Sequence, residues 1–375
     1  MAPPGASTIV VLGAYAPSLI LFRGKLIEAL AARGHRVVAM AADISDEVAA
    51  RLRAIGAEPV SVRIANQSLN PVTSVLSLFG LIRTLKAARP QAIIAYTAKP
   101  VTLGGLAARF VAGARFVPMI TGLGFAFIPG SGLRRRLARP AALLLYRLAL
   151  CRAPLVIFQN PDDCDFFLAK GLVAQGAETL VVGGSGVDLK HYRPAPLPGD
   201  PAFLMIARLL GDKGVREYLA ASVRLKQSHP EVAFRLIGYF DDSPDAVGSA
   251  EVEAAVAGGV EFLGRTADVR PGIADASVYV LPSYHEGTPR SVLEAMAMGR
   301  AIVTTDVPGC RQTVEPGVNG LLVAARDVDS LAGAMEKLIR EPARIAEMGR
   351  ASRVLAEQRF DVDKVNQAIL EAAGL

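Results

Sequence analysis

Residues 277–299 read Ser-Val-Tyr-Val-Leu-Pro-Ser-Tyr-His-Glu-Gly-Thr-Pro-Arg-Ser-Val-Leu-Glu-Ala-Met-Ala-Met-Gly, and no other stretch says as much about the fold. The apolar start, which ends at Pro282, is typical of a buried strand. Gly287 then supplies a sharp turn, Thr288 can cap a helix, and Pro289 suits a first helical turn. The stretch therefore predicts a strand, a loop and a helix in succession.

Two carboxylates, Glu286 and Glu294, lie eight positions apart across this junction. Glu286 falls in the loop over the predicted helix start, and Glu294 falls about two turns inside the helix. Because a helix start attracts phosphates and other anions, two acids beside it suggest sugar hydroxyls as their partners. A capped surface helix with two solvated acids would give the same pattern, and both interpretations stay open at this point.

The rest of the chain alternates short apolar runs with helical patterns. In the first half, strands are expected at residues 8–12, 36–41, 59–63, 92–96, 116–121 and 155–159, and helices at 22–32, 47–55, 72–88 and 102–111. After the Pro-rich residues 190–200, strands are expected at 203–207, 234–238, 260–263, 278–281, 301–304 and 320–323, and late helices at 343–359 and 362–372. This alternation predicts an α/β fold of two tandem, doubly wound Rossmann-like domains with a cleft between them.

The charge is distributed unevenly along the chain. The net charge is +6, but residues 1–190 carry 21 Lys and Arg against 10 Asp and Glu. Between Pro59 and Pro161 there are 13 basic residues and no acid. A positive field of this kind favours an anionic surface or substrate. Nucleic acid is not expected, because no recognition module is present and aromatic residues are not interleaved with the basic ones.

Cysteines and targeting signals indicate the compartment. Cys151, Cys164 and Cys310 are odd in number and lack metal spacing, so we expect buried thiols in a reducing environment. No apolar run reaches the roughly 18 residues of a spanning helix, and the N-terminus lacks the features of a signal peptide. These features predict a cytoplasmic protein.

A pair of cations follows the first strand of the second half. Arg208 and Lys213 lie five positions apart beside glycines. At a strand end they could neutralise a diphosphate, with charge-assisted bonds of about 1.5–3 kcal/mol each; a solvated turn is the alternative. Parallel strands would bring both cations and the loop after Leu281 to the same sheet edge, which favours a shared site.

With these two pairs in this order, nearly the whole chain resembles the retaining GT-B glycosyltransferases of family 4. Arg208 and Lys213 match that family's Arg…Lys pair, and Glu286 and Glu294 match its Glu-x7-Glu motif. Within the family, the chain is similar to the branch that extends undecaprenyl-diphosphate-linked sugars. The segments that carry this narrower resemblance are residues 22–24, 96–100, 121–125, 159–163 and 184–188.

The resemblance implies a role for each matching residue. Arg208 and Lys213 would hold the donor diphosphate and, with Glu286, form the catalytic set. Glu286 would contact hydroxyls of the donor sugar, and Glu294 would bond the ribose. The further donor-binding residues would be His285, Gly287, Thr288, Pro289 and Arg265, and the acceptor or cleft residues would be Arg23, Lys99, Thr121 and Gly122. No metal or other cofactor is expected, because the cations neutralise the leaving group.

Two positions depart from the family pattern. Many family 4 enzymes carry a histidine after a mid-domain strand, where this chain has Thr121. A histidine-assisted step is therefore in doubt. Gln312 stands where relatives often have an acid.

The segment Leu133–Leu150 mixes arginines with leucines. A basic amphipathic helix could lie on an anionic leaflet, at about 1 kcal/mol per basic residue near the surface. A core helix with an arginine-flanked start is the alternative.

Together these features predict three parts and one function. Residues 1–190 would form an acceptor- and membrane-facing domain, residues 200–358 a nucleotide-sugar-binding domain, and residues 359–375 a helix packing back on the first domain. The expected enzyme is a retaining glycosyltransferase, peripheral on the inner face of the plasma membrane. It would move a hexosyl or N-acetylhexosaminyl unit from a nucleotide-diphosphate sugar, with uridine as the expected base, to a polyprenyl-diphosphate-linked saccharide in bacterial surface polysaccharide or glycan assembly. The alternatives are the same chemistry on a soluble acceptor, an NAD(P)-dependent oxidoreductase, or a non-catalytic nucleotide-sugar-binding protein. The oxidoreductase lacks support, since no Gly-x-Gly-x-x-Gly follows the first strand.

Overall fold

The computed structural model describes residues 6–64, 71–122 and 133–375, apart from the side chains of 71–72 and 133–138. The chain divides into two compact units. The first comprises residues up to Ser185 together with Asp363–Leu375, and the second comprises Gly186–Val362. The Pro-rich residues 190–200, which lie between the two predicted domains, therefore belong to the second unit.

The first unit is built on a seven-stranded sheet in the order β3-β2-β1-β4-β5-β6-β7, in which every pairing is parallel. Its strands are β1 (Thr8–Tyr15), β2 (Arg36–Ala42), β3 (Ala57–Ser61), β4 (Ala92–Tyr96), β5 (Arg115–Ile120), β6 (Leu155–Phe158) and β7 (Glu178–Val181). Its helices are α1 (Ala16–Leu21), α2 (Gly24–Ala32), α3 (Asp46–Ala54), α4 (Pro71–Ala88), α5 (Ala98–Ala108), α6 (Leu133–Leu150), α7 (Pro161–Ala169) and most of α14 (Val362–Ala373).

The second unit has a six-stranded parallel sheet in the order β10-β9-β8-β11-β12-β13. Its strands are β8 (Ala202–Arg208), β9 (Ala233–Tyr239), β10 (Glu261–Gly264), β11 (Val278–Leu281), β12 (Ala301–Thr305) and β13 (Gly320–Val323). Its helices are α8 (Val215–Ser228), α9 (Ser249–Ala257), α10 (Arg270–Ala274), α11 (Arg290–Ala297), α12 (Val328–Arg340) and α13 (Pro342–Arg359), with short 3-10 turns at Gly211–Lys213 and Arg311–Thr313. Both units follow the doubly wound strand order, so the predicted α/β class with two Rossmann-like domains is confirmed.

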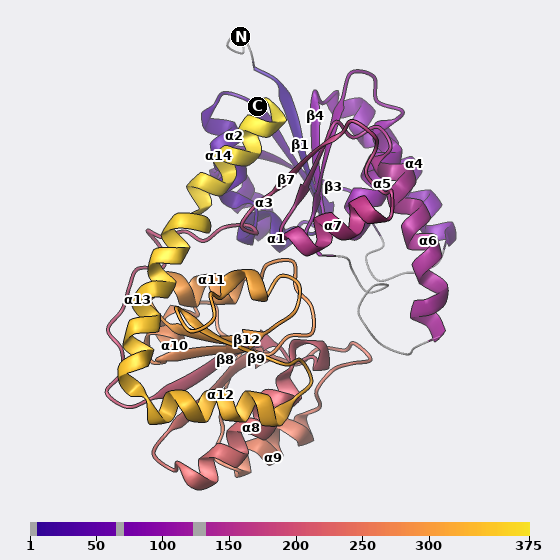
Figure 1. The fold of residues 1–375 in the computed structure, drawn as a ribbon. Coiled ribbons are helices and arrows are strands. Elements are labelled where there is room, and N and C mark those ends of the chain that lie inside the picture. The colour runs from indigo at the N-terminus through magenta and orange to yellow at the C-terminus, as the bar shows by residue number, and fades with distance from the viewer. Residues whose placement is uncertain (1–5, 65–70, 123–132) are drawn as a thin grey trace. The chain divides into compact units, whose positions relative to one another are not determined.

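The sheet of the first unit is buried on both faces because its strands are apolar at consecutive positions. Ile9 and Val11 of β1 pack into one core, whereas Val10 and Leu12 pack into the other, as the two-residue period of a strand requires. Helices α1, α2, α3 and α14 cover the first of these faces, and α4, α5, α6 and α7 cover the second. Figure 1 shows α14, in yellow, beside α2 at the end of the chain.

Helix α14 completes a core that the earlier part of the first unit leaves unfilled. Val365, Ile369 and Leu370 are buried among side chains of the first unit's sheet and helices. Val365, Ile369 and the buried Ala373 are spaced by four residues, and Leu370 precedes Ala373 by three. These side chains therefore lie on one helix face, which is the pattern of an amphipathic helix.

Three elements were not predicted from the sequence. Helix α1 has only six residues, and α7 begins at a proline capped by Asn160, whose side chain accepts a hydrogen bond from the Asp163 backbone N–H. Strand β7 lies at the edge of the sheet and is mostly exposed, so it lacks the apolar run of a buried strand. Cys164 and Cys310 are buried as expected, but Cys151 is exposed.

Candidate functional site

The functional residues of the second unit gather where its sheet changes direction. The chain proceeds from β8 outward to β9 and β10, then returns to β11 on the other side of β8. Ligands of open α/β sheets bind beyond the carboxyl ends of the strands at such a switch point. Arg208 is the last residue of β8, and the loop that carries Glu286 follows β11.

Lys213 and Glu286 form an ion pair at this point. The Lys213 Nζ donates to Glu286 Oε1 at 2.6 Å, and the Ser283 hydroxyl donates to the same oxygen at 2.8 Å. The two charged side chains are only 20% and 16% exposed. Burial lowers the pKa of Lys213, but the Glu286 carboxylate, together with Asp212, more than offsets this, so that the pKa lies above the ordinary lysine value. The lysine is therefore held as a cation.

The backbone brings the loops of these two residues into contact. Gly214 follows Lys213 with a φ of +72°, and a Cβ at this position would lie 2.1 Å from the carbonyl oxygen of Pro282. The Tyr284 N–H donates to the carbonyl of Asp212 at 2.9 Å. Only glycine fits such a left-handed, crowded position, so Gly214 is what allows the lysine turn to reach the glutamate loop.

The segment Pro308–Gly309 packs closely against the backbone of Glu286. The Glu286 N–H donates to Pro308 at 3.1 Å, and a Cβ on Gly309 would lie 2.2 Å from the Glu286 carbonyl. The side chain of Gln312 accepts a hydrogen bond from the Gly309 N–H at 2.7 Å. Gln312, one of the two departures from the family pattern, thus stabilises the turn at Gly309 through its amide oxygen.

Arg208 lies beside this pair but has a different partner. Its side chain is 48% exposed, and its Nη1 lies 3.2 Å from Asp241 Oδ2, just past β9. A hydrogen bond from Ser243, together with Arg208, lowers the pKa of Asp241. The field of Arg208 also reaches Lys213, whose pKa it lowers. The two cations therefore share one sheet edge, as the sequence predicts.

Glu294 is buried within α11 and accepts two hydrogen bonds on one oxygen. Tyr192 Oη and Arg290 Nε each donate to Glu294 Oε1 at 2.8 Å. Burial raises the pKa of Glu294, although both donors act in the opposite direction. Neither donor was predicted from the sequence. The four-residue spacing of Arg290 and Glu294 was an available signal, whereas Tyr192 lies 102 positions away.

The start of α11 differs from the prediction. The helix begins at Arg290, one residue later than expected, and its N-cap is Pro289 instead of Thr288. The Thr288 hydroxyl instead donates to the carbonyl of Gly287 at 2.9 Å. Glu294 is therefore the fifth residue of the helix, just over one turn inside rather than two.

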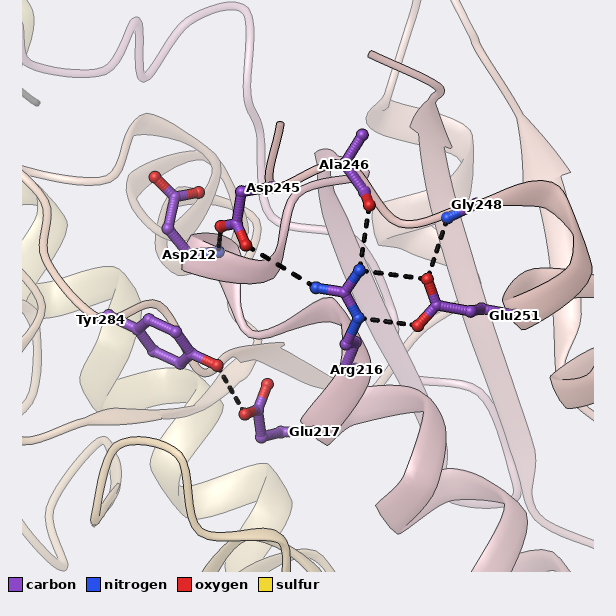
Figure 2. Close-up of polar contacts among 8 residues, drawn as sticks. All are labelled: Asp212, Arg216, Glu217, Asp245, Ala246, Gly248, Glu251 and Tyr284. Carbon is purple, nitrogen blue, oxygen red and sulfur yellow. Dashed lines mark hydrogen bonds and ion pairs between the residues drawn. The ribbon is translucent and has the colours of Figure 1, made fainter. Parts of the chain in front are cut away.

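A polar scaffold on α8 and α9 supports the lysine turn (Figure 2). The Arg216 Nε donates to Glu251 at 2.7 Å, and its Nη2 donates to the same carboxylate at 3.1 Å and to the Ala246 carbonyl at 2.9 Å. Asp245 accepts from the Asp212 N–H at 2.7 Å, next to Lys213. Figure 2 also shows the Tyr284 hydroxyl donating to Glu217 of α8, at 2.6 Å. Helix α8 is thereby attached to both loops.

The two remaining predicted donor residues lie on separate loops. His285 is partly buried and adjoins Glu286 in sequence. The guanidinium of Arg265, after β10, lies 5.3 Å from the ring centre of Tyr239 at the end of β9. Arg265 is therefore at the carboxyl edge of the sheet, the edge at which the sequence predicts donor binding.

In the first unit, the predicted acceptor residues lie at the carboxyl ends of β4 and β5. The buried guanidinium of Arg23 lies 5.0 Å from the ring centre of Tyr96, whose hydroxyl is 2.7 Å from that of Ser18. Burial raises the pKa of Tyr96 to about 12, so the hydroxyl stays protonated. Thr121 and Gly122, which follow β5, are both partly exposed; residues 123–125 of this segment lie outside the described residues.

The start of α5 is strained. Thr97 has a φ of +67°, which is unfavourable for a β-branched residue and is found mostly at functional sites. Lys99 follows in the first turn of α5, and burial lowers its pKa.

The described part of the chain contains neither a cluster of metal-binding side chains nor a membrane-spanning helix. No group of three or more His, Cys, Asp or Glu side chains there is arranged to hold a metal ion. No described helix combines the length and hydropathy of a membrane-spanning segment.

The chain matches the models of two protein families. Residues 200–341 match the glycosyl transferases group 1, and residues 23–183 match the glycosyl transferase 4-like domain. These matches cover most of both units.

Two relatives extend the comparison over most of the chain. It is 30% identical over 338 residues to N,N'-diacetylbacillosaminyl-diphospho-undecaprenol alpha-1,3-N-acetylgalactosaminyltransferase of Campylobacter jejuni, covering 86% of this chain and 87% of that protein. It is 26% identical over 294 residues to UDP-Gal:alpha-D-GlcNAc-diphosphoundecaprenol alpha-1,3-galactosyltransferase of Escherichia coli, covering 72% of each.

Among solved structures, sucrose-phosphate synthase from Thermosynechococcus elongatus has a TM-score of 0.80 at 19% identity, over 98% of both chains. Anabaena HepE in complex with UDP has a TM-score of 0.77 at 22% identity, over 98% of this chain and 99% of its own. These neighbours share the GT-B fold that the sequence predicts.

Proposed function

The chain belongs to the glycosyl transferases of group 1, and we propose that it transfers a hexosyl or N-acetylhexosaminyl unit from a UDP-linked sugar to a polyprenyl-diphosphate-linked saccharide, with retention. The names of the C. jejuni and E. coli relatives support the lipid-linked acceptor. The UDP in HepE and the UDP-Gal in the E. coli name support the donor base. Membership of this family also removes the oxidoreductase alternative.

The buried Lys213–Glu286 pair at the switch point carries this proposal. A donor brings a diphosphate, and Lys213 is held as a cation where that diphosphate would lie. When the diphosphate becomes the partner of Lys213, Glu286 is released to accept hydrogen bonds from sugar hydroxyls. Without donor, Lys213 and Glu286 bond to each other. With donor, each would exchange this partner for a part of the donor, Lys213 for the diphosphate and Glu286 for the sugar.

Arg208 and Glu294 complete the donor site. Arg208 is half-exposed and is bonded to Asp241 at 3.2 Å, so it can turn to the diphosphate at little cost. It would stabilise the charge that develops as the nucleotide leaves; loss of one such group typically costs about 10²–10³ in rate. Glu294, fixed by Tyr192 and Arg290 through one oxygen, would present the other to the ribose hydroxyls.

The reaction would proceed on one face of the sugar. The bond between the anomeric carbon and the diphosphate breaks, the acceptor hydroxyl bonds to the same face, and the departing phosphate takes the hydroxyl's proton. Lys213 and Arg208 supply the charge stabilisation that a metal ion would otherwise give, so we propose that no metal or other cofactor takes part.

The first unit would bind the acceptor. Lys99 and Arg23 lie at the carboxyl edge of a sheet whose surroundings are basic, which suits the diphosphate of a lipid-linked saccharide. We propose that the enzyme works at the inner face of the plasma membrane, in assembly of a surface polysaccharide or other glycan.

A transfer assay tests this function directly. The protein is incubated with each of a set of radiolabelled UDP-sugars and a synthetic undecaprenyl-diphosphate saccharide, and label in the lipid phase is measured. We expect transfer from one donor, and a fall of at least about 100-fold in the Lys213→Ala variant. Transfer to sugar phosphates alone would favour a soluble acceptor. Donor binding without transfer or hydrolysis would indicate a binding protein.

A further inference from the structure

Helix α4 presents an exposed apolar stripe. Val75, Leu76 and Phe79 are 50%, 66% and 66% exposed. Arg83 and Lys86 continue the same face toward the end of the helix and are also exposed. On the opposite side, Leu81 and Leu85 are buried in the core, so the helix is anchored and its outer face is apolar at one end and basic at the other.

Helix α6 presents a second stripe of the same kind. Leu144, Leu145 and Leu148 are 57%, 42% and 38% exposed. Arg147 lies among them and is exposed, whereas Tyr146, Ala149 and Leu150 are buried. The segment is thus a core helix on one face and an apolar, basic surface on the other, which combines the two interpretations of its sequence.

Both helices belong to one layer. They pack on either side of α5 and share with it the core beneath the second face of the first unit's sheet. Helix α5 is itself buried from Pro100 to Gly105, so the outer surface of this layer is formed by α4 and α6. Their exposed stripes therefore face away from the sheet on the same side of the first unit, and we call them together the α4–α6 face.

The charge of the α4–α6 face selects its partner. All its charged residues are basic, because the chain has no acid between Pro59 and Pro161. A second copy of the chain would bring like charges together, which opposes self-association. An anionic leaflet instead offers phosphates to the arginines and hydrocarbon to the leucines and phenylalanine.

We propose that the α4–α6 face docks onto an anionic lipid leaflet, with its apolar side chains below the headgroups and its cations among the phosphates. This inference rests on the proposed lipid-linked acceptor. The proposed function names no membrane-binding surface, and this inference supplies one that includes the apolar end of α4. At such an interface, apolar side chains enter the leaflet while arginines keep their charged ends among the headgroups.

The chain topology relates this face to the acceptor. Helix α4 follows β3 and α5 follows β4, so in a parallel sheet both start at the carboxyl edge. The apolar end of α4 therefore lies at the same edge as Lys99, in the first turn of α5. A diphosphate held in the headgroup layer would meet Lys99 while its prenyl chain stays in the leaflet.

Vesicle flotation of the full-length protein tests the proposal. Wild type is expected to float with vesicles of phosphatidylglycerol and phosphatidylcholine, and less with phosphatidylcholine alone. The Leu76→Glu/Phe79→Glu variant should lose at least about 100-fold in partitioning, which corresponds to about 2.8 kcal/mol. An Arg83→Gln change should cost about fivefold, and only with anionic vesicles.

A matched control separates this face from general surface changes. Val256 of α9 and Val354 of α13 are 46% and 48% exposed in the second unit. Their double change to glutamate should leave flotation unaltered. Melting temperatures of all variants should stay near that of wild type, since every changed side chain is exposed. Equal flotation of the α4 variant and the control, or no flotation of wild type, would overturn the proposal.

Transfer assays distinguish this proposal from the proposed function. The Leu76→Glu/Phe79→Glu variant should lose transfer to acceptor embedded in vesicles but keep it with a short-chain acceptor soluble in water. Equal loss with both acceptors overturns the docking role, because the site itself would then be damaged. Absence of transfer by wild type with either acceptor refutes the proposed function, whatever the flotation result. A wild-type dimer that the α4 variant breaks, with flotation unchanged, would identify the face as a self-association surface instead.

Discussion

Replacing Glu286 by glutamine tests whether the buried pair does what its geometry indicates. The change keeps the size of the side chain and removes its charge, so Lys213 loses its counterion. Both side chains are less than one-quarter exposed and their charged atoms are 2.6 Å apart. Removing one partner of a fully buried pair costs about 3–5 kcal/mol, and exposed pairs contribute about 0–1 kcal/mol. We therefore expect a loss of about 1–3 kcal/mol in the free energy of unfolding.

The pH dependence of this loss has a definite sign. In wild type the pKa of Lys213 lies above its ordinary value of 10.5 because of Glu286. The pair therefore adds stability below pH 10.5, which is lost as pH rises through the raised pKa. In the variant, burial, which is the largest influence on Lys213, is no longer opposed by Glu286 and lowers the pKa of the lysine, so the variant regains stability as the lysine deprotonates. The stability deficit should be largest near neutral pH and should shrink as pH approaches 10.5.

Urea unfolding between pH 7 and 10 measures the deficit, and a transfer assay on the same samples measures turnover, which should fall by about 100-fold or more. The control is Glu28→Gln. Glu28 pairs with Lys25 at 2.9 Å, but the two are 41% and 46% exposed, so the loss should stay below about 0.5 kcal/mol. If the Glu286→Gln protein unfolds like wild type, or turns over donor at the wild-type rate, the pair has no such role.

Three further changes test the surroundings of this pair. Tyr192→Phe removes a donor to the buried Glu294 and should raise the donor KM about tenfold with little effect on kcat, as steady-state kinetics would show; an unchanged KM would contradict the proposed ribose contact. Tyr284→Phe removes the 2.6 Å bond to Glu217 and should cost about 1–2 kcal/mol in urea unfolding, whereas a neutral effect would mean that the bond does not hold the Glu286 loop to α8. Turnover should persist in excess EDTA but fall about 10²–10³-fold in Arg208→Ala; loss of activity with EDTA would contradict the proposal that the cations replace a metal.

The parts of the fold predictable from sequence are those that bury apolar runs. Strand β11 is recognisable because Val278 to Leu281 are all buried between helices, and a central parallel strand must be apolar on both faces. Strand β7 was missed for the opposite reason, since an edge strand exposes most of its side chains. Helix α1 was missed because six residues carry too little periodicity to show a face.

Some residues of the candidate site were also predictable from sequence, and others were not. Arg208, Lys213 and the loop after β11 were predictable as neighbours, because strand order alone brings them to one sheet edge. Tyr192 was not, because residues 190–200 have the composition of a linker, and only the folded unit shows that the tyrosine hydroxyl reaches Glu294. Composition indicates where a chain can bend, but a hydrogen bond over 102 positions depends on packing.

The two units handle charge in different ways, and this difference fits two different anionic substrates. Around the switch point of the second unit three cations each have an acid: Arg208 with Asp241, Lys213 with Glu286, and Arg290 with Glu294. A diphosphate donor can exchange with such acids and be released again, because the pairs re-form when it leaves. The first unit keeps its cations without acids over residues 59–161, so its positive field persists at a distance of about 8–10 Å in physiological salt. A field of that kind suits a surface that stays bound through many turnovers, while exchangeable pairs suit a substrate that must come and go in each one.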